Sequence, residues 1–336
     1  MSCMKKRILY IDYMKAIAII LVIIGHVNFA NDGVKAWIYA FHMPAFFFCS
    51  GLVLTNGKTT DPLECMRNKF KRLMIPYFLW ALLFAKFSIK SLLLIIYGSY
   101  WSISRSGALS SLWFLPVIFI ALGFYYMLDY TGAIKNLVLK LLITLLAFSV
   151  CLMLPSIKYG YPWAADVALM AFTFLLLGNA TRSTLDKLFN WAKSSKILGL
   201  FFLFTIMIIL VLGSLLYKYN EINGGYVLMS CARYGNILLF FFVAFWGTLM
   251  LVLASMILEL LNARGFKWLI FVGQNTLCIF AVQKPIINLF KVIFQHLQWP
   301  NSLVLAVTSV GTLIISCLLC VFINKYTPIL VGKNKM

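Results

Sequence analysis

Apolar runs long enough to cross a lipid bilayer follow one another along almost the whole chain. Of the 336 residues, 63% are hydrophobic and only 11% are charged, whereas soluble domains carry about 25% charged residues. A helix needs roughly 20 apolar residues to span a bilayer. We therefore expect an all-α, polytopic integral membrane protein that forms a single membrane-embedded domain. About ten spans are expected, at residues 8–29, 36–55, 73–97, 112–130, 134–154, 164–180, 197–217, 236–260, 268–290 and 302–323.

The net charge of +20 would suit a nucleic-acid-binding protein, but the distribution of the cations argues against that class. Nineteen of the 29 basic residues flank the apolar runs on one side of the expected topology, six lie on the other side, and four lie within the runs. The side that is rich in Lys and Arg is normally cytoplasmic. We therefore expect a multi-pass protein of the cell membrane with both termini in the cytoplasm, in contact with lipid and not with nucleic acid.

The third run, 73–97, is unusual because it contains Lys86 and Lys90. Charged residues at that density do not suit one continuous lipid-facing helix. We expect a helix followed by a short re-entrant or interfacial piece.

The eight cysteines of the chain form no recognisable framework. Cys317 and Cys320 have the spacing of a metal or redox pair, but they lie in an apolar run without other ligands nearby. Cysteines in such a place are ordinarily small core residues. No metal site is predicted.

The first run contains ionisable residues that a lipid-facing helix should not carry. In a helix, Lys15 and His26 share one face, because eleven residues make just over three turns, and they lie about 16 Å apart along the axis. Such groups at membrane depth usually face a protein interior or a wet cavity and mark a functional site. Asp12 lies three residues before Lys15, so an intrahelical ion pair is the alternative role for that lysine.

The second run carries another of the three histidines, His42, beside Pro44. Because this run returns across the membrane, we expect His42 at about the same depth as His26. A neutral imidazole can take a proton from a hydroxyl near physiological pH, since its ordinary pKa is about 6.5. The two histidines therefore predict one catalytic cavity, the alternative for His42 being a hydrogen bond at a helix end.

Two connecting segments suit polar ligands. The predicted cytoplasmic loop 56–72 ends in the basic sequence RNKFKR, residues 67–72. Four cations in six residues suit phosphate groups, although such clusters often set topology or bind anionic lipid instead. The outer loop 218–235 contains EINGGY at 221–226, which suits a polar substrate or simply a turn.

Several short motifs follow one another in a fixed order. They are DYMK (12–15), GH (25–26), FHMPAFFFCSG (41–51), RNKFKRLMIPY (67–77), LWFLP (112–116), FLLLG (174–178) and GQNTL (273–277). In this order they resemble the membrane-bound acyltransferase family 3, and the first motifs are similar to those of its fucose-acetylase type of sugar O-acetylase. The likeness spans most of the chain.

The resemblance implies an O-acyltransferase that takes acetyl from cytoplasmic acetyl-CoA. The implied acceptor is a carbohydrate hydroxyl of a surface polysaccharide or of its lipid-linked precursor. By position, His26 is then the catalytic histidine and general base, Lys15 its paired basic residue, and His42 a second active-site histidine. Candidate contacts for the CoA phosphates are Arg67, Lys69 and Arg72.

The resemblance also suggests residues that bind the substrate. Members of this branch often have a histidine where this chain has Gln283, and a glutamine cannot take a proton at neutral pH, so catalysis would fall on His26 and His42. His42, Gln283 and Trp113 are candidates to hydrogen-bond the developing oxyanion or to orient the sugar. Asp166 is a possible orienting carboxylate for one imidazole, and Asn275 a further substrate contact.

Two other functions remain open from the sequence. The buried charges would also suit a transporter or flippase for a lipid-linked glycan, but such proteins usually show repeats or paired broken helices, and the sequence shows neither. Gln283 would also suit a degenerate family member that acts as a non-catalytic membrane component.

Overall fold

The computed structural model describes residues 7–27, 32–86, 88–155, 157–220, 222, 225–262, 264–296 and 299–333. Within these ranges the chain consists of helices joined by short connections, and the described residues form no β-strand beyond an isolated bridge between Leu228 and Arg233. Seven helices of the described ranges are long and apolar enough to cross a membrane. The prediction of an all-α, polytopic membrane protein is confirmed.

The helices have the following bounds. The long apolar ones are α1 (Leu9–His26), α7 (Phe114–Tyr130, preceded by a 3-10 turn at Ser110–Trp113), α9 (Ala165–Ser194), α10 (Lys196–Ser214), α11 (Ile237–Leu261), α13 (Thr276–Phe294) and α14 (Asn301–Tyr326). The others are α2 (Asp32–Leu52), α3 (Pro62–Lys69), α4 (Ile75–Phe84), α5 (Ile89–Tyr97), α6 (Tyr100–Ser106), α8 (Leu137–Met153) and α12 (Trp268–Gln274).

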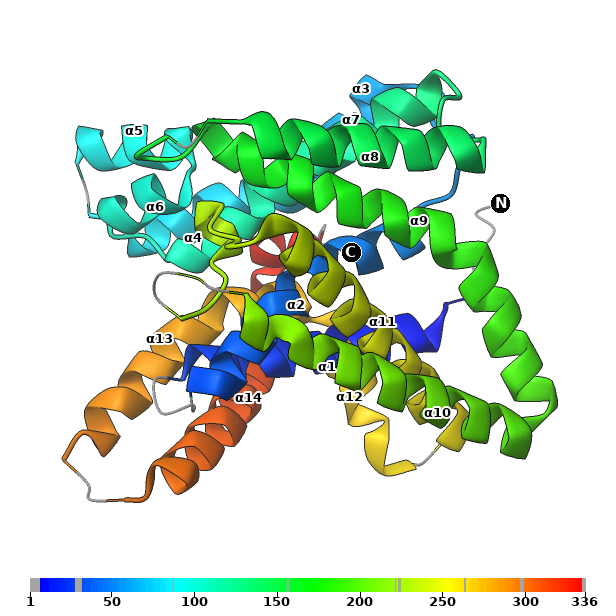
Figure 1. The fold of residues 1–336 in the computed structure, drawn as a ribbon. Helices are drawn as coiled ribbons and strands as arrows, with labels where there is room; N and C mark the ends of the chain where they lie inside the picture. The colour runs from blue at the N-terminus through cyan, green and yellow to red at the C-terminus, as the bar shows by residue number, and fades with distance from the viewer. Residues whose placement is uncertain are drawn as a thin grey trace.

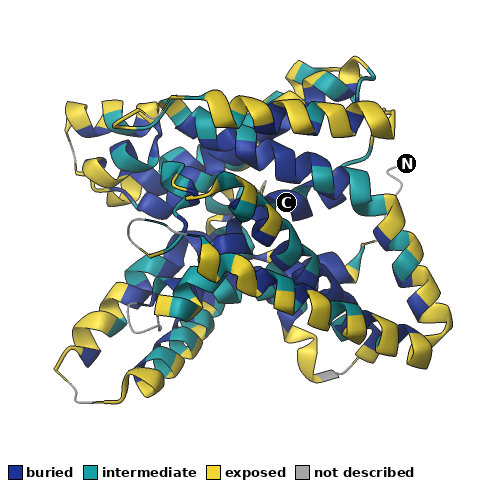
Figure 2. Ribbon diagram, viewed as in Figure 1, coloured by how far each residue is buried: buried dark blue, intermediate teal, exposed yellow. Residues whose placement is uncertain are grey.

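Helices α1 and α2 lie at the centre of the molecule (Figure 1). Helix α1 packs against α2, α11 and α12, and α2 packs against α9 and α11. Helices α7, α8 and α9 form a layer on one side, and α13 and α14 extend together on another (Figure 1). Buried residues concentrate where these groups meet (Figure 2). The first hairpin, which carries the two predicted histidines, is therefore enclosed by protein rather than by lipid.

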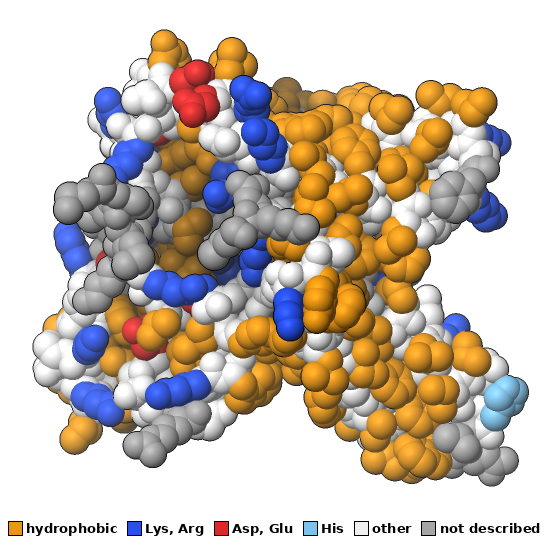
Figure 3. Space-filling view, turned by 180° about the vertical axis from the view of Figure 1, so that it is seen from behind, with side chains coloured by type: hydrophobic (Ala, Val, Ile, Leu, Met, Phe, Trp, Pro, Cys, Tyr) orange, Lys and Arg blue, Asp and Glu red, His pale blue; other side chains and the backbone are white. Residues whose placement is uncertain are grey.

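The outer surface is largely apolar, as expected for helices that face lipid. Helices α8, α10 and α14 expose rows of large hydrophobic side chains. Figure 3 shows hydrophobic side chains over one half of a face and Lys and Arg side chains gathered on the other half. Most of the cations on this face thus lie on one part of it.

Three of the predicted apolar runs do not correspond to one helix of the same length. The third is broken between α4 and α5, with Lys86 in the break, as the helix-plus-short-piece interpretation expected. The run 268–290 is also broken, at Asn275, where a continuous helix was predicted. The Asn275 side chain donates a hydrogen bond to the carbonyl of Phe271, which competes with regular helix geometry. The run 164–180 continues as helix α9 to Ser194, so part of the predicted loop 181–196 is helical.

The basic cluster, predicted to be a loop, is helical as well. Asp61 begins α3 by accepting hydrogen bonds from two backbone N–H groups of its first turn. The helix then passes into α4 through a wider π-helical turn at Phe70–Met74. Pro76 lacks the N–H that a regular helix would donate to the carbonyl of Arg72, and the wider turn accommodates the missing bond. We call residues 62–84 the α3–α4 segment.

Helices α2 and α9 cross in close contact, which explains two of the short motifs. A side chain at Gly51 would collide with the carbonyl oxygen of Leu175, and one at Gly178 would collide with that of Phe48. Small residues allow membrane helices to approach until their backbones touch. The two motif glycines therefore fix α2, and with it His42, against the rest of the bundle.

Candidate active site

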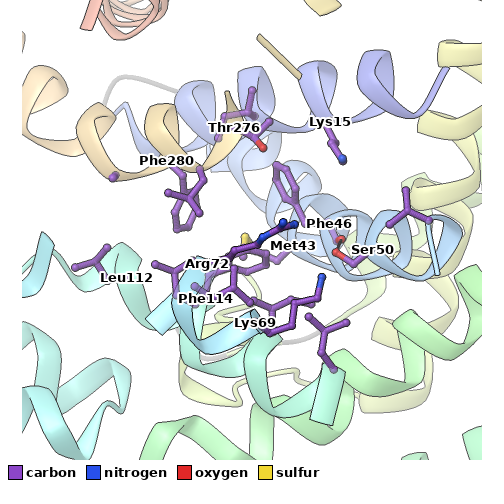
Figure 4. Close-up of a pocket in the computed structure, with 18 of the residues that line it drawn as sticks. Lys15, Met43, Phe46, Ser50, Lys69, Arg72, Leu112, Phe114, Thr276 and Phe280 are labelled. Atoms are coloured by element: carbon purple, nitrogen blue, oxygen red, sulfur yellow. Dashed lines mark hydrogen bonds between the residues drawn. The ribbon is translucent and has the colours of Figure 1, made fainter. Parts of the chain in front are cut away.

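A chamber of about 290 Å³ lies among the central helices, between α1, α2, the α3–α4 segment, α7 and α13. One part of its wall is basic and another is apolar (Figure 4). We call it the basic chamber. It is lined by Lys15, Ile19, Met43, Phe46, Ser50, Val53, Leu54, Lys69, Arg72, Leu73, Leu112, Phe114, Leu115, Ile118, Leu122, Thr276, Leu277, Phe280 and Ala281.

Three cations reach the basic chamber from two separate parts of the chain. Lys15 extends from α1, and Lys69 and Arg72 extend from the α3–α4 segment (Figure 4). None of the described residues that line this chamber is acidic. Burial lowers the pKa of Lys69 below its ordinary value of 10.5, and the charge of Arg72 lowers it further. A bound anion would relieve this repulsion, so the chamber is suited to phosphate.

The third predicted phosphate contact, Arg67, is not part of this chamber. Its side chain is exposed and does not belong to the lining. Lys69 and Arg72 are three residues apart and share a helix face, whereas Arg67 precedes Lys69 by two residues, about 200° around the helix. Helical geometry therefore separates Arg67 from the other two cations, and the structure gives no support for its predicted contact with a CoA phosphate.

Lys15 does not form the ion pair with Asp12 that the sequence offered as its alternative role. The Asp12 carboxylate instead accepts from Arg7, with 2.5 Å between Oδ2 and the guanidinium Nε. Lys15 has no hydrogen-bond or ion-pair partner among the described residues. Its ammonium group is therefore available to a ligand in the basic chamber.

A second, smaller chamber of about 140 Å³ contains both predicted histidines. His26 and His42 each contact the ring of Tyr39, with centroid distances of 6.2 Å and 4.9 Å. The expectation that the first hairpin brings the two imidazoles to one cavity is confirmed. We call this cavity the histidine chamber. It is lined by His26, Tyr39, His42, Met43, Tyr100, Ser110, Ser111, Trp113, Tyr226, Val227, Leu228, Met229, Ser230, Phe280 and Lys284.

One hydrogen bond fixes the tautomer of His42. Its Nδ1 lies 2.8 Å from the carbonyl oxygen of Ile38, one helical turn earlier. A carbonyl can only accept, so Nδ1 must carry the proton and Nε2 of the neutral ring keeps a free lone pair. The neutral His42 side chain can therefore accept a hydrogen bond or a proton, but it cannot donate to an oxyanion. The sequence proposal that His42 binds the oxyanion is not favoured by this geometry.

The two chambers meet at Met43 and Phe280, which line both of them. Three helices, α1, α2 and α13, each contribute residues to both chambers. On α1 these residues run from Lys15 to His26, and on α13 they run from Leu277 to Lys284. Groups bound in the two chambers would therefore approach each other at the Met43–Phe280 boundary.

Trp113 and Gln283 differ in their access to the histidine chamber. Trp113 lines the chamber, as predicted. Gln283 is fully buried, does not line either chamber, and its amide oxygen and nitrogen make no hydrogen bond. It lies close to the His26 imidazole. These observations do not support a direct contact between Gln283 and substrate. Gln283 instead lies where it can hold the His26 ring in position.

The other two predicted substrate contacts lie elsewhere. Asp166, in the first turn of α9, lines a separate pocket with Cys151, Arg233 and Tyr234, and no described imidazole is its partner. The structure therefore gives no support for the predicted role of Asp166 in orienting an imidazole, and for His42 the Ile38 carbonyl takes that role. Asn275 lines neither chamber.

The reason lies in the partners of Asn275. Its side-chain oxygen accepts from Asn324 at 2.7 Å and from Lys333 at 3.4 Å. These bonds tie the α12–α13 break to the C-terminal part of the chain. Asn275 therefore holds the fold together behind the basic chamber and is not placed to contact substrate.

The sequence did not single out several residues of the histidine chamber. Lys284 is the clearest of these, since it is a cation inside a predicted span, the same signal that selected Lys15. From the outer loop, Tyr226 and residues 227–230 line the chamber, whereas Glu221, Asn223 and Gly224 lie outside the described residues. The remaining contributors, Tyr39, Tyr100, Ser110 and Ser111, carry no motif that sequence reasoning could use.

Comparison with known proteins identifies the family. The model of one family, the acyltransferase domain of acyltransferase family 3, matches residues 8–321. The chain belongs to this family. The match runs from the beginning of α1 into α14, so it includes both chambers. Among curated proteins, none matches the chain. Membership in family 3 confirms that the protein is a membrane acyltransferase.

Proposed function

We propose that this family 3 protein is an O-acetyltransferase of the fucose-acetylase type. It would move acetyl from cytoplasmic acetyl-CoA to a hydroxyl of a surface polysaccharide or its lipid-linked precursor. The observation that carries the proposal is the meeting of the two chambers at Met43 and Phe280. Group transfer requires the thioester carbon and the hydroxyl oxygen to be held in contact, and this boundary is a place where they can meet.

The basic chamber suits the donor. CoA is rich in phosphate, and Lys15, Lys69 and Arg72 present positive charge that no acidic lining residue among those described neutralises. Arginine and lysine are the usual ligands of phosphate oxygens. Beyond these cations the chamber wall is apolar, with Phe46 and Phe114, which suits the pantetheine arm. The positive-inside rule favours the cytoplasmic side for this end of the bundle, and acetyl-CoA is found on that side.

The histidine chamber suits a sugar. Aromatic rings of Tyr39, Tyr100, Trp113 and Tyr226 form much of its wall, and such rings pack against the apolar faces of carbohydrates while their polar ends bond to hydroxyl groups. In the proposed reaction His26 takes the proton of one acceptor hydroxyl. The Nε2 lone pair of His42 accepts a hydrogen bond from the sugar and orients it.

The transfer itself is a single exchange at the thioester carbonyl. As His26 removes the hydroxyl proton, the sugar oxygen forms a bond to the carbonyl carbon. The carbon–sulfur bond breaks, and the sulfur leaves as the CoA thiolate, which takes up the proton from His26. The Ser111 hydroxyl lines the chamber, is buried and has no partner. Ser111 and the Trp113 indole N–H are the neutral donors available to the developing oxyanion.

The test is acetyl transfer by the purified protein. Acetyl-CoA labelled in the acetyl group is supplied with surface glycan isolated from cells that lack this gene. We expect label to appear on the glycan as base-labile ester, in amounts equal to the free CoA thiol released. If the glycan remains unlabelled and CoA thiol is not released above the level without protein, the proposal is wrong. The flippase alternative is not proposed, because the family is one of acyltransferases.

A further inference from the structure

The histidine chamber contains one lysine, Lys284, that has no role in the reaction proposed above. Lys284, on α13, is the single cation among the described residues that line this chamber, and no described lining residue is acidic. Its ammonium group contacts the hydroxyl of Ser110. The ion pairs of the described chain are Arg7–Asp12 and Arg182–Asp186, so Lys284 takes part in neither.

A second cation stands beside the same chamber. Lys35 lies over the ring of Tyr226, 4.4 Å from its centroid, and 5.8 Å from that of Tyr39. Both rings line the chamber. Lys35, Tyr39 and His42 follow one another at spacings of four and three residues, so they share one face of α2. The positive charge of Lys284 is therefore reinforced from a neighbouring wall.

A cation without a counter-ion is costly inside a membrane protein. A hydroxyl such as Ser110 solvates the ammonium only in part, because a neutral oxygen compensates much less charge than a carboxylate or a phosphate. A ligand with a negative charge would supply the counter-ion that Lys284 lacks in this chamber. The acceptor is the ligand that occupies this chamber in the proposed reaction.

We infer that the acceptor sugar carries a permanent negative charge, a carboxylate or a phosphate, and that Lys284 together with Ser110 forms its anion-binding subsite. This inference rests on the proposed acetyl transfer and narrows its substrate class to acidic glycans. The aromatic walls then hold the sugar ring, Lys284 holds its acidic group, and His26 faces the hydroxyl that is acetylated.

The alternative use of Lys284 is to stabilise the transient oxyanion of the thioester. Neutral donors for that purpose are already present, in Ser111 and Trp113. The two roles predict different dependence on the acceptor. An oxyanion forms with every acceptor, whereas an anion subsite matters only for an acidic one.

The experiment compares the acceptor glycan in three forms, isolated from cells that lack this gene. One form is untreated, one has its carboxyl groups reduced to alcohols, and one has its phosphates removed with hydrogen fluoride. Wild-type protein and the variants Lys284→Gln, Lys284→Arg and Lys291→Gln are assayed with acetyl-CoA, and kcat/KM is measured for each glycan. Lys291 is a matched control, because it is an exposed cation of the same helix that lines neither chamber.

We expect one of the two treatments to lower wild-type kcat/KM by about tenfold to a hundredfold, the range of a charged hydrogen bond, and that treatment identifies the anion. Lys284→Gln should lower kcat/KM for the untreated glycan by a similar factor, mainly through KM, and should have no further effect on the neutralised glycan. Lys284→Arg should retain most activity, and Lys291→Gln all of it.

Three results would overturn the inference while leaving the transferase intact. They are an acetylated acceptor that contains neither carboxylate nor phosphate, equal rates with treated and untreated glycan, or a Lys284→Gln defect of the same size on every form. The last result would assign Lys284 to the reaction itself. Absence of transfer by wild-type protein to all three forms is a different outcome, because it overturns the proposed function together with the inference.

Discussion

The two chambers share Met43 and Phe280 but are built from different kinds of side chain. The basic chamber presents long cations, two of them from the amphipathic α3–α4 segment. The histidine chamber presents aromatic rings, short hydroxyls and imidazoles held by packing and by the bond from His42 to Ile38. Long cations attract and retain an anionic ligand at some distance, whereas fixed imidazoles perform proton transfer that depends on exact placement.

This difference predicts which kinetic constant a substitution in each chamber should change. If the proposed function is right, changes in the basic chamber should act on the affinity for acetyl-CoA, because its cations would contact parts of the donor far from the reacting carbon. Substitutions of the two histidines should act on turnover, because their imidazoles would contact the reacting hydroxyl in the proposed reaction. Variants of the basic chamber and of the histidines therefore separate KM for the donor from kcat.

The largest effect is expected for His26→Gln. Glutamine keeps hydrogen-bonding capacity but cannot take a proton, so kcat should fall by roughly 10²- to 10⁴-fold, the range of general base catalysis. Acetyl transfer to the glycan is the measurement, at matched amounts of membrane-inserted protein. His296→Gln is the control, because His296 is the third histidine and lies exposed after α13. Near-normal turnover by His26→Gln would remove His26 from the role of base.

A smaller loss is expected for His42→Gln, about tenfold to a hundredfold in kcat/KM for the acceptor, in line with a good hydrogen bond to the reacting substrate. The amide can still accept a hydrogen bond from the sugar but loses the fixed lone pair that the Ile38 carbonyl orients. Steady-state kinetics of both histidine variants in parallel give the ranking. If His42→Gln is the more severe of the two, the roles of base and orienting group are exchanged.

The basic chamber is tested by the double substitution of Lys69 and Arg72 by glutamine. We expect KM for acetyl-CoA to rise by roughly tenfold or more, since each charge-assisted bond contributes about 1.5–3 kcal/mol, with kcat nearly unchanged. Arg67→Gln is the matched control, because it removes a cation of the same cluster that faces away from the chamber. Donor titrations at saturating glycan distinguish the two. An equal rise in KM for Arg67→Gln would show that the cluster acts through its overall charge.

Much of this arrangement was predictable from the sequence, for physical reasons. Lys15, His26 and His42 were found because ionisable groups in membrane-length runs are rarely there without function, and helix periodicity gave their shared face. Lys284 carries the same signal. The sequence predicts a loop for the run of cations, in which Arg67 is equivalent to its neighbours, whereas the observed helix α3 directs it away from the chamber.

Other features could not be predicted because they depend on contacts between distant segments. The partners of Asn275 lie 49 and 58 residues further along the chain, and the seating of Asp166 in a separate pocket depends on how α9 packs beside residues 232–237. The close contacts of Gly51 with Leu175 and of Gly178 with Phe48 also join segments that are distant in the sequence. Only the assembled bundle shows whether a polar side chain meets a cavity or another part of the protein.

The smallest effect is expected at the boundary between the chambers, for Met43→Ala. In the proposed reaction the acyl group lies at this boundary, so shortening the Met43 side chain should leave more space there and propionyl-CoA should gain relative to acetyl-CoA. Pockets discriminate one methylene by about 1–3 kcal/mol, and partial loss of that discrimination should change the ratio of the two kcat/KM values by several-fold. Met250→Ala is the control, because Met250 is buried in α11 and lines neither chamber. An unchanged ratio in Met43→Ala would place the acyl group away from this boundary, and the two chambers would then have to exchange it by another route.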